Sequence, residues 1–224
     1  MENIKIPLIL SPKIKQQIQY LCKKVSKVEW SGVLFYTIEG TLHDIKNLKL
    51  TAQEILPLNV GTNSYTEFSA GGNFVDYMDN NEYLENFKMG LVHSHNSMPT
   101  YFSKIDIEEL KNNAPNYNFY LSFIVNNYMD FCAKFCFIAE SDTQKAELIS
   151  RDEDGYEYLV GETEIKASKL ITYDCEIIEE NFINLETDFV NQVDYIIAEK
   201  DIKEKMFASN KGYNGKFKTG NLLD

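Results

Sequence analysis

The sequence predicts an α/β protein in which helices flank a mixed β-sheet. Segments with helical spacing of apolar residues alternate along the chain with short apolar, β-branched segments, and 44% of the 224 residues are hydrophobic. This length and composition suit one sizeable domain, which we place at residues 1–145. Residues 146–207 are expected to form a smaller C-terminal α+β appendage, a strand pair followed by a helix, and residues 208–224 a flexible tail.

The chain is expected to begin with a strand and a helix. Apolar side chains alternate over residues 4–10, which predicts a short strand, and Pro7 favours an edge position because proline cannot donate to a β-ladder. Ser11 and Pro12 are the residue types preferred at a helix N-cap and at the first helical position. A helix is therefore expected from there to about Ser26.

The later elements follow the same two periodicities. We expect a buried strand at 29–38, one or two further strands within 41–58, a helix at 73–86 and a strand at 88–95. A helix is expected from Ser103 onward, followed by strands at 119–126 and 128–140 that a tight turn at Asn126-Asn127 joins. The last predicted elements are a strand pair, 156–160 and 170–178, and a helix at 182–207. This alternation of helices and strands is typical of layered α/β folds.

Charge and cysteine content exclude several classes of function. A net charge of −12, with Arg151 as the only arginine, argues against sequence-independent nucleic-acid binding, which needs Lys and Arg to displace counterions. No stretch has the length or hydrophobicity of a membrane span or a secretory signal. Four cysteines are few for a disulfide framework, so we expect a soluble protein of the reducing cytoplasm.

Two of the three histidines lie one residue apart at the end of an apolar run, at His93 and His95. A strand points alternate side chains to one face, so both imidazoles can converge on one point. Asp106 is a third candidate ligand, and Glu29 is a carboxylate that could act on a bound water. Two imidazoles, one carboxylate and an open fourth position are typical of catalytic zinc, whereas structural zinc sites are closed by four protein ligands.

The complete pattern is a Glu-x-x-Gly strand, then His-x-His, seven residues, Ser, two residues and Asp. It resembles the motif of the JAMM (JAB/MPN) zinc metalloprotease family, over about residues 4–140. The resemblance implies a JAMM/MPN-like mixed sheet flanked by helices and a Zn²⁺ held by His93, His95 and Asp106. It also implies that Glu29 is the general base and then acid, and that Ser103 donates a hydrogen bond to the developing oxyanion.

The sequence departs from the family at one position, where Asn96 stands in place of the usual proline after the second histidine. Proline would fix φ in the loop that leaves the strand, so this departure bears on the rigidity of the loop. Taken alone, Ser103 and Asp106 would be interpreted as a helix cap with a first-turn acid. Zincin and zinc-deaminase motifs are absent from the sequence. An amidohydrolase barrel would require further histidines after His95, and the sequence has none there.

The sequence thus predicts a zinc-dependent peptidase or isopeptidase. Its expected partner is a protein or peptide substrate, and the resemblance implies a conjugate of a ubiquitin-like modifier. The alternative is a non-catalytic MPN-like scaffold or assembly module, against which the intact set of site residues argues. The predicted helix at 182–207 has a broad apolar face that could dock on the domain or mediate self-association.

Overall fold

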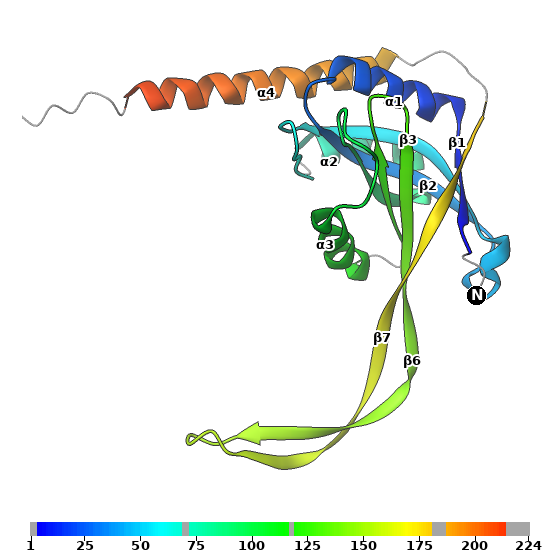
Figure 1. Ribbon diagram of the computed structural model, residues 1–224, viewed down its shortest axis with the longest axis vertical. Helices are drawn as coiled ribbons and strands as arrows, with labels where there is room; N and C mark the ends of the chain where they lie inside the picture. Colours follow the sequence, from blue (N-terminus) through cyan, green and yellow to red (C-terminus); the bar gives the residue numbers. More distant parts are fainter. Residues whose placement is uncertain (1–3, 69–71, 117–118, 181–186, 214–224) are drawn as a thin grey trace, which may run out of the picture.

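Strands dominate the computed structural model, which describes residues 4–68, 72–116, 119–180 and 187–213 (Figure 1). In these residues the strands are β1 (Ile6–Leu10), β2 (Trp30–Glu39), β3 (Lys49–Val60), β4 (Lys88–Ser94), β5 (Phe119–Val125), β6 (Phe131–Arg151) and β7 (Glu157–Glu179). The helices are α1 (Pro12–Lys24), α2 (Gly72–Asn80), α3 (Lys104–Asn113) and α4 (Thr187–Tyr213), with short 3-10 segments η1 (Leu42–Asn47), η2 (Glu82–Asn86) and η3 (Ala114–Asn116).

The described strands close into one barrel in the order β1-β3-β2-β4-β5-β6-β7. β1 closes it by pairing in parallel with β3 on one side and β7 on the other, so that Leu8 lies opposite both Leu50 and Ile177. β4 and β5 are also parallel, whereas the other neighbouring strands are antiparallel.

The predicted fold class is therefore wrong. The sheet is mixed, as expected, but it closes on itself in a mainly β structure instead of forming a JAMM/MPN-like sheet flanked by helices with a smaller C-terminal α+β appendage. The physical reason is that local periodicity gives the order of helices and strands but not which strands pair. The pairing of β1 with β7 joins distant parts of the chain and leaves no local pattern that would reveal it.

The hydrophobic core fills the barrel and continues beneath α1 and α4, which cover one end of it (Figure 1). Trp30, the only tryptophan of the chain, is fully buried there. The predicted cap of α1 is also confirmed, because the Ser11 hydroxyl accepts the backbone N–H of Ile14 at 3.3 Å. The buried apolar residues of these helices are Ile14, Ile18, Leu21 and Cys22 from α1 and Phe189, Val193 and Ile196 from α4.

Two predicted elements differ in detail. The helix expected at 73–86 is α2 followed by the separate 3-10 segment η2. The tight turn expected between β5 and β6 is a five-residue connection, 126–130, in which the Asn126 side-chain oxygen accepts the backbone N–H of Tyr128 and of Asp130, both at 3.0 Å. These side-chain bonds add to two backbone bonds that close the turn, from the Asn126 N–H to the Asp130 carbonyl at 3.2 Å and from the Met129 N–H to the Asn126 carbonyl at 3.1 Å.

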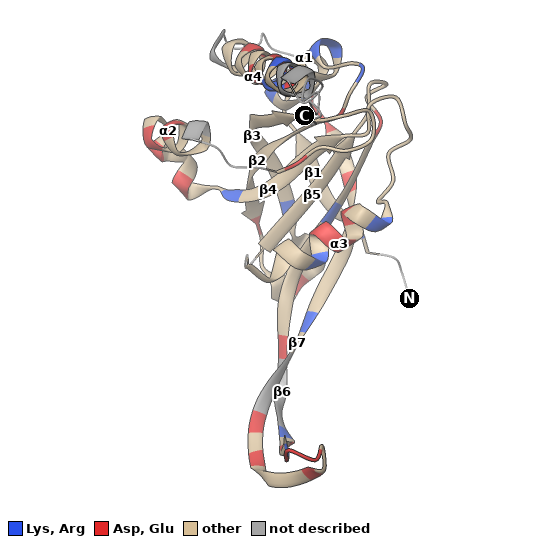
Figure 2. Cartoon of the chain, turned by 90° about the vertical axis from the view of Figure 1, so that its left-hand side faces the viewer, with Lys and Arg blue, Asp and Glu red and all other residues tan. Residues whose placement is uncertain are grey.

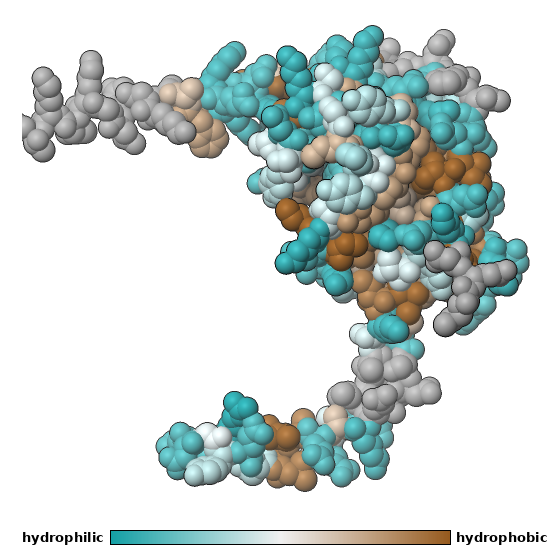
Figure 3. All heavy atoms as spheres, viewed as in Figure 1, coloured by the Kyte–Doolittle hydropathy of each residue, from teal (hydrophilic) through white to brown (hydrophobic). Residues whose placement is uncertain are grey.

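The outer halves of β6 and β7 leave the barrel as a two-stranded arm, which Figure 1 shows bending away below it. β7 is one continuous strand where two were expected, and β6 runs through residue 145. In the outer part of the arm, Leu148, Ile149 and Leu159 are about half exposed. Figure 3 shows a hydrophobic patch on this part of the arm. α4 continues to Tyr213, and the rest of the predicted tail, 214–224, lies outside the described residues.

Among the described residues, no helix is both long and apolar enough to cross a membrane.

Candidate metal centre

The register between β2 and β4 brings both histidines and Glu29 to one side of the sheet. Ser31 of β2 lies directly opposite His93 of β4 in this antiparallel pair. Continuing the register by two residues places Glu29 across from His95, and alternate residues of a strand share a face. The backbone holds Glu29 in that extended path, because its N–H donates to the Thr62 carbonyl at 2.7 Å and its carbonyl accepts from Gly61 at 2.8 Å.

Gly32, the glycine of the sequence motif, lies where β2 passes close to the backbone of β3. A Cβ at this position would lie 2.5 Å from the backbone oxygen of Leu56. Heavy atoms cannot approach so closely without a shift of the backbone. Glycine is therefore required for the packing of β2, the strand that begins directly after Glu29.

Asp106 reaches the histidines from the first turn of α3. Its two carboxylate oxygens lie 3.1 Å from His93 Nε2 and 3.5 Å from His95 Nε2. Ser103 and Asp106 form a reciprocal capping box, in which the Ser103 hydroxyl accepts the Asp106 N–H at 3.2 Å and the Asp106 carboxylate accepts the Ser103 N–H at 2.7 Å. The helix cap therefore fixes the carboxylate that faces the two imidazoles.

The three side chains fit a divalent metal ion. One ligand atom from each of His93, His95 and Asp106 lies within 4.8 Å of the others. Tetrahedral ligands at about 2.1 Å from a zinc ion are about 3.4 Å apart, which is close to the separations between the imidazole nitrogens and the carboxylate. Two imidazoles and one carboxylate leave a fourth position for water or substrate.

The loop after β4 fixes the orientation of His95. The Nδ1 atom of His95 lies 3.1 Å from the carbonyl oxygen of Pro99, so a proton on Nδ1 would donate to this oxygen and leave the lone pair of Nε2 for a metal ion. Asn96 has φ of +53°, a backbone conformation that proline cannot adopt. Its side chain donates to the carbonyl of Lys27 at 3.0 Å and accepts from the Asn127 amide at 3.0 Å, so hydrogen bonds hold this loop at the position where the motif that the sequence resembles has proline.

Glu29 is 4% exposed and lies in the same cleft as the histidines. Burial raises the pKa of its carboxyl, and the charges of His93 and His95 act against that increase. The effect of Asp106 is smaller and adds to it. A carboxylate with a raised pKa is a stronger base than an exposed one, which suits proton abstraction from water.

Asp106 and His95 have opposite pKa shifts. Burial acts to raise the pKa of Asp106, but hydrogen bonds from His93, His95 and Ser103 outweigh it and hold this pKa far below its usual range. Burial is the largest single effect on His95 and acts to lower its pKa, but the bonds to Asp106 and Pro99 and the charges of Asp106 and Glu29 together outweigh it, so the pKa is raised. Asp106 is thus ionised at neutral pH, as a metal ligand must be.

The cleft around these residues has a volume of about 620 Å³. Its walls are largely apolar, and they include Tyr65, Phe68, Met98, Tyr101 and Ile105. Phe68 and Tyr101 place ring edges against His93 and His95, with centroids 5.9 and 5.7 Å apart. A cleft of this size and character can accommodate a short segment of polypeptide.

Sequence analysis missed Glu109, which lines the cleft from α3. Its Oε1 atom accepts the Tyr120 hydroxyl and the Asn113 amide, the latter at 2.7 Å. Burial raises the pKa of this carboxyl, and the bonds from Tyr120 and Asn113 act in the opposite direction. The signal that could have revealed it is its spacing, since residues three apart on a helix are neighbours on its surface and Asp106 is three residues earlier.

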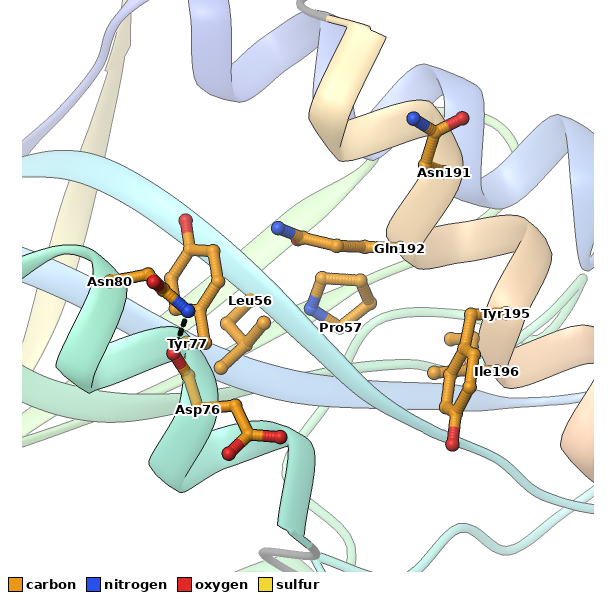
Figure 4. A pocket seen from close by; sticks show the side chains of 9 residues that line it. All are labelled: Leu56, Pro57, Asp76, Tyr77, Asn80, Asn191, Gln192, Tyr195 and Ile196. Carbon is orange, nitrogen blue, oxygen red and sulfur yellow. Dashed lines mark hydrogen bonds between the residues drawn. The ribbon is translucent and has the colours of Figure 1, made fainter.

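A second cavity, of about 340 Å³, lies between α2, β3 and α4 (Figure 4). Tyr77, Tyr195 and Ile196 line it together with the amides of Asn80 and Gln192. Its lining contains no histidine or cysteine, and its one acidic residue is Asp76. The side chains suited to hydrolytic chemistry therefore lie in the cleft beside β4 and α3.

Comparisons with known proteins do not assign a family to this chain. No family model matches it, and no curated protein matches it. Among solved structures, it is similar to the solution structure of protein DSY2949 from Desulfitobacterium hafniense. The identity is 17%, the match covers 81% of this chain and 97% of that chain, and the TM-score is 0.41. We draw nothing about function from this likeness, so the geometry of the site and its sequence motif are the basis for assigning a function.

Proposed function

We propose that this protein is a zinc-dependent peptidase or isopeptidase, with the activity that its JAMM-like motif implies. One observation supports this more than any other. His93, His95 and Asp106 converge within 4.8 Å, and Glu29 lies in the same cleft although it is far away in the sequence. These four side chains are the ligands and the base that metal-assisted amide hydrolysis needs.

The residues of the chain divide the reaction between them. A zinc ion held by His93, His95 and Asp106 would supply a Lewis acid and lower the pKa of water in the fourth position. Glu29 takes the proton from the attacking water and then delivers it to the leaving nitrogen as the C–N bond breaks. The second proton of the water passes from the new carboxyl group to the amine, so the products are a carboxylate and an ammonium group, and Glu29 returns to its ionised form.

Ser103 supplies the remaining interaction in this proposal. Its oxygen accepts the Asp106 N–H, which leaves the hydroxyl proton for a second bond toward the cleft that Ser103 lines. We assign that proton to the oxyanion that forms on the substrate carbonyl. The substrate class, which includes conjugates of ubiquitin-like modifiers, rests on the resemblance of the motif, and the cytoplasmic location stays a proposal.

The test compares Glu29→Gln with the wild-type protein on peptide and isopeptide substrates. Glu29→Gln is expected to retain zinc and to lose about 10²–10⁴-fold in turnover, because the amide cannot accept the water proton. Glu67→Gln is the matched control, since Glu67 lines the same cleft but is exposed, and it should hydrolyse substrate at the wild-type rate. Hydrolysis by Glu29→Gln at the wild-type rate would refute the assigned base.

The arm favours a second candidate function, that of an assembly module. Its described outer part, residues 145–164, exposes apolar side chains near the tip and carries seven acidic and two basic residues (Figures 2 and 3). An isolated two-stranded hairpin is marginally stable in water, so a protein partner would stabilise it. Ile202 and Phe207 on α4 are also exposed and could contribute to self-association. A protein that binds no metal and has no hydrolase activity would support this alternative.

A further inference from the structure

Three buried polar atoms beside the candidate metal site have no hydrogen-bond partner. They are His93 Nδ1, Ser122 Oγ and Glu109 Oε2, from β4, β5 and α3 respectively. Ser122 is fully buried and His93 is 5% exposed, so neither side chain has ready access to water in place of a protein partner. A buried polar group without a partner typically costs about 1–3 kcal/mol.

The strand register places His93 and Ser122 on the same face of the sheet. β4 and β5 are parallel neighbours, with Leu91 opposite Ser122 and His93 opposite Ile124. Paired residues of neighbouring strands share a face, and so do alternate residues of one strand. His93 and Ser122 are therefore diagonal neighbours on one side of this strand pair.

Glu109 lies over the same face. Tyr120 is two residues before Ser122 on β5, so both side chains point to this side of the sheet. The Tyr120 hydroxyl donates to Glu109 Oε1, which holds the carboxylate above β5. The second carboxylate oxygen, Oε2, is the one without a partner.

The two histidines differ in how they are held. His95 Nδ1 already has the Pro99 carbonyl oxygen at 3.1 Å, whereas His93 Nδ1 has no described partner. A histidine that binds a metal through Nε2 carries its proton on Nδ1 and almost always donates it to an oxygen. A serine hydroxyl can accept that proton and donate its own, and a carboxylate oxygen can only accept.

We propose that Ser122 and Glu109 are positioning residues for the metal ligand His93. In this arrangement His93 Nδ1–H donates to Ser122 Oγ, and Ser122 Oγ–H donates to Glu109 Oε2, so all three unpartnered atoms are satisfied together. These bonds are not formed in the structure, and rotation about the side-chain torsions of Ser122 and Glu109 is the movement that would form them. The inference rests on the proposed function, because it requires that His93 binds a metal through Nε2.

The test measures zinc affinity in the full chain by competition with a chromophoric chelator. Ser122→Ala and Glu109→Gln are each expected to bind zinc 10–100-fold more weakly than the wild-type protein. In Glu109→Gln the Tyr120 hydroxyl would keep its hydrogen bond to the side-chain oxygen of residue 109. The NH₂ group would then lie where the Ser122 hydroxyl needs an acceptor. Glu108→Gln is the matched control on the exposed side of α3 and should bind zinc within twofold of wild type.

A second measurement separates positioning from a merely structural role. With three histidines in the chain, ¹⁵N-histidine labelling gives a simple spectrum. The zinc-bound wild-type protein should show a slowly exchanging Nδ1–H signal for His93, and this signal should be lost in Ser122→Ala while the melting temperature stays within a few degrees. Ser122→Ala removes a single oxygen, so the variant is expected to fold.

The outcomes distinguish this inference from the proposed function. A wild-type protein that binds one zinc, with both variants binding within twofold of it, would overturn the role of Ser122 and Glu109 and leave the proposed function intact. A wild-type protein that binds no zinc would overturn both. Weaker zinc binding by both variants would support the inference. If the double variant Ser122→Ala/Glu109→Gln loses less binding free energy than the sum of the two single losses, the two residues act in a single hydrogen-bonded chain.

Discussion

Ser103 is expected to affect both stability and turnover, and two substitutions separate these effects. Its hydroxyl caps α3 by accepting the Asp106 N–H at 3.2 Å. Ser103→Ala removes this bond, at a cost of about 1 kcal/mol, whereas glycine at an N-cap costs only a few tenths of a kcal/mol. For a chain of this length, 1 kcal/mol corresponds to a decrease of about 2–4 °C in melting temperature.

Both substitutions also remove the donor that we assign to the oxyanion. The loss of one such donor typically lowers kcat by about 10²–10³-fold, or 2.7–4 kcal/mol. We therefore expect Ser103→Gly to melt close to wild type but to hydrolyse substrate at least 100-fold more slowly, and Ser103→Ala to show both losses. Thermal melts and turnover would be measured on the same preparations, with Ser103→Thr as the variant that keeps the hydroxyl. Wild-type turnover by Ser103→Gly would refute the oxyanion role, and wild-type stability of Ser103→Ala would refute the assigned cap.

Three further predictions concern residues around the site. Glu29→Gln should raise the melting temperature of the metal-free protein at pH 7, because burial raises the pKa of Glu29 and its ionisation therefore destabilises the folded state. This gain should vanish well below the usual pKa of 4.5, where the carboxyl is neutral in both the folded and the unfolded state. A lower melting temperature of Glu29→Gln at pH 7 would contradict this prediction. Asn96→Pro should prevent folding of the loop after β4, since φ of +53° is closed to proline, whereas Asn96→Gly should cost about 1 kcal/mol; equal urea midpoints for the two would contradict this account. Gly32→Ala should cost about 1–3 kcal/mol in urea denaturation, because its Cβ would lie 2.5 Å from the Leu56 oxygen, and an unchanged midpoint would show that the strands can separate at no cost.

Part of the site could be predicted from sequence because it depends on local geometry. His93 and His95 are alternate residues at the end of a strand, and Ser103 and Asp106 lie at the first turn of a helix, as their spacing suggests. Glu29 joins them through the register of two neighbouring strands. The first two relations follow from a period of two and from a helix cap, which a sequence shows directly. The place of Glu29 depends on strand pairing, and only the resemblance of the motif implied it.

The closure of the sheet and the arm could not be predicted in this way. The pairing of β1 with β7 depends on contacts between distant parts of the chain. In the arm, both faces of β6 and β7 are open to solvent, so polar residues such as Glu162 and Glu164 interrupt the apolar pattern within one continuous strand. Hydrophobic periodicity identifies half-buried strands, and it fails where neither face is buried.

Asn96 and Glu109 show the same limit at the scale of single residues. The sequence shows that proline is absent after His95, but not that Asn96 takes a left-handed conformation and bonds to Lys27 and Asn127. Glu109 looks like an ordinary helical acid until the packing of α3 against β5 brings it to Tyr120. Tertiary contacts decide both roles.

The most direct test of the central claim is the metal content of the purified protein. Plasma mass spectrometry would compare the wild-type protein with His93→Ala/His95→Ala, both purified without chelators and then offered zinc. We predict about one zinc per chain in the wild-type protein and none above background in the variant. A wild-type protein with no more zinc than the variant would contradict the account and leave the assembly module as the better explanation of this chain.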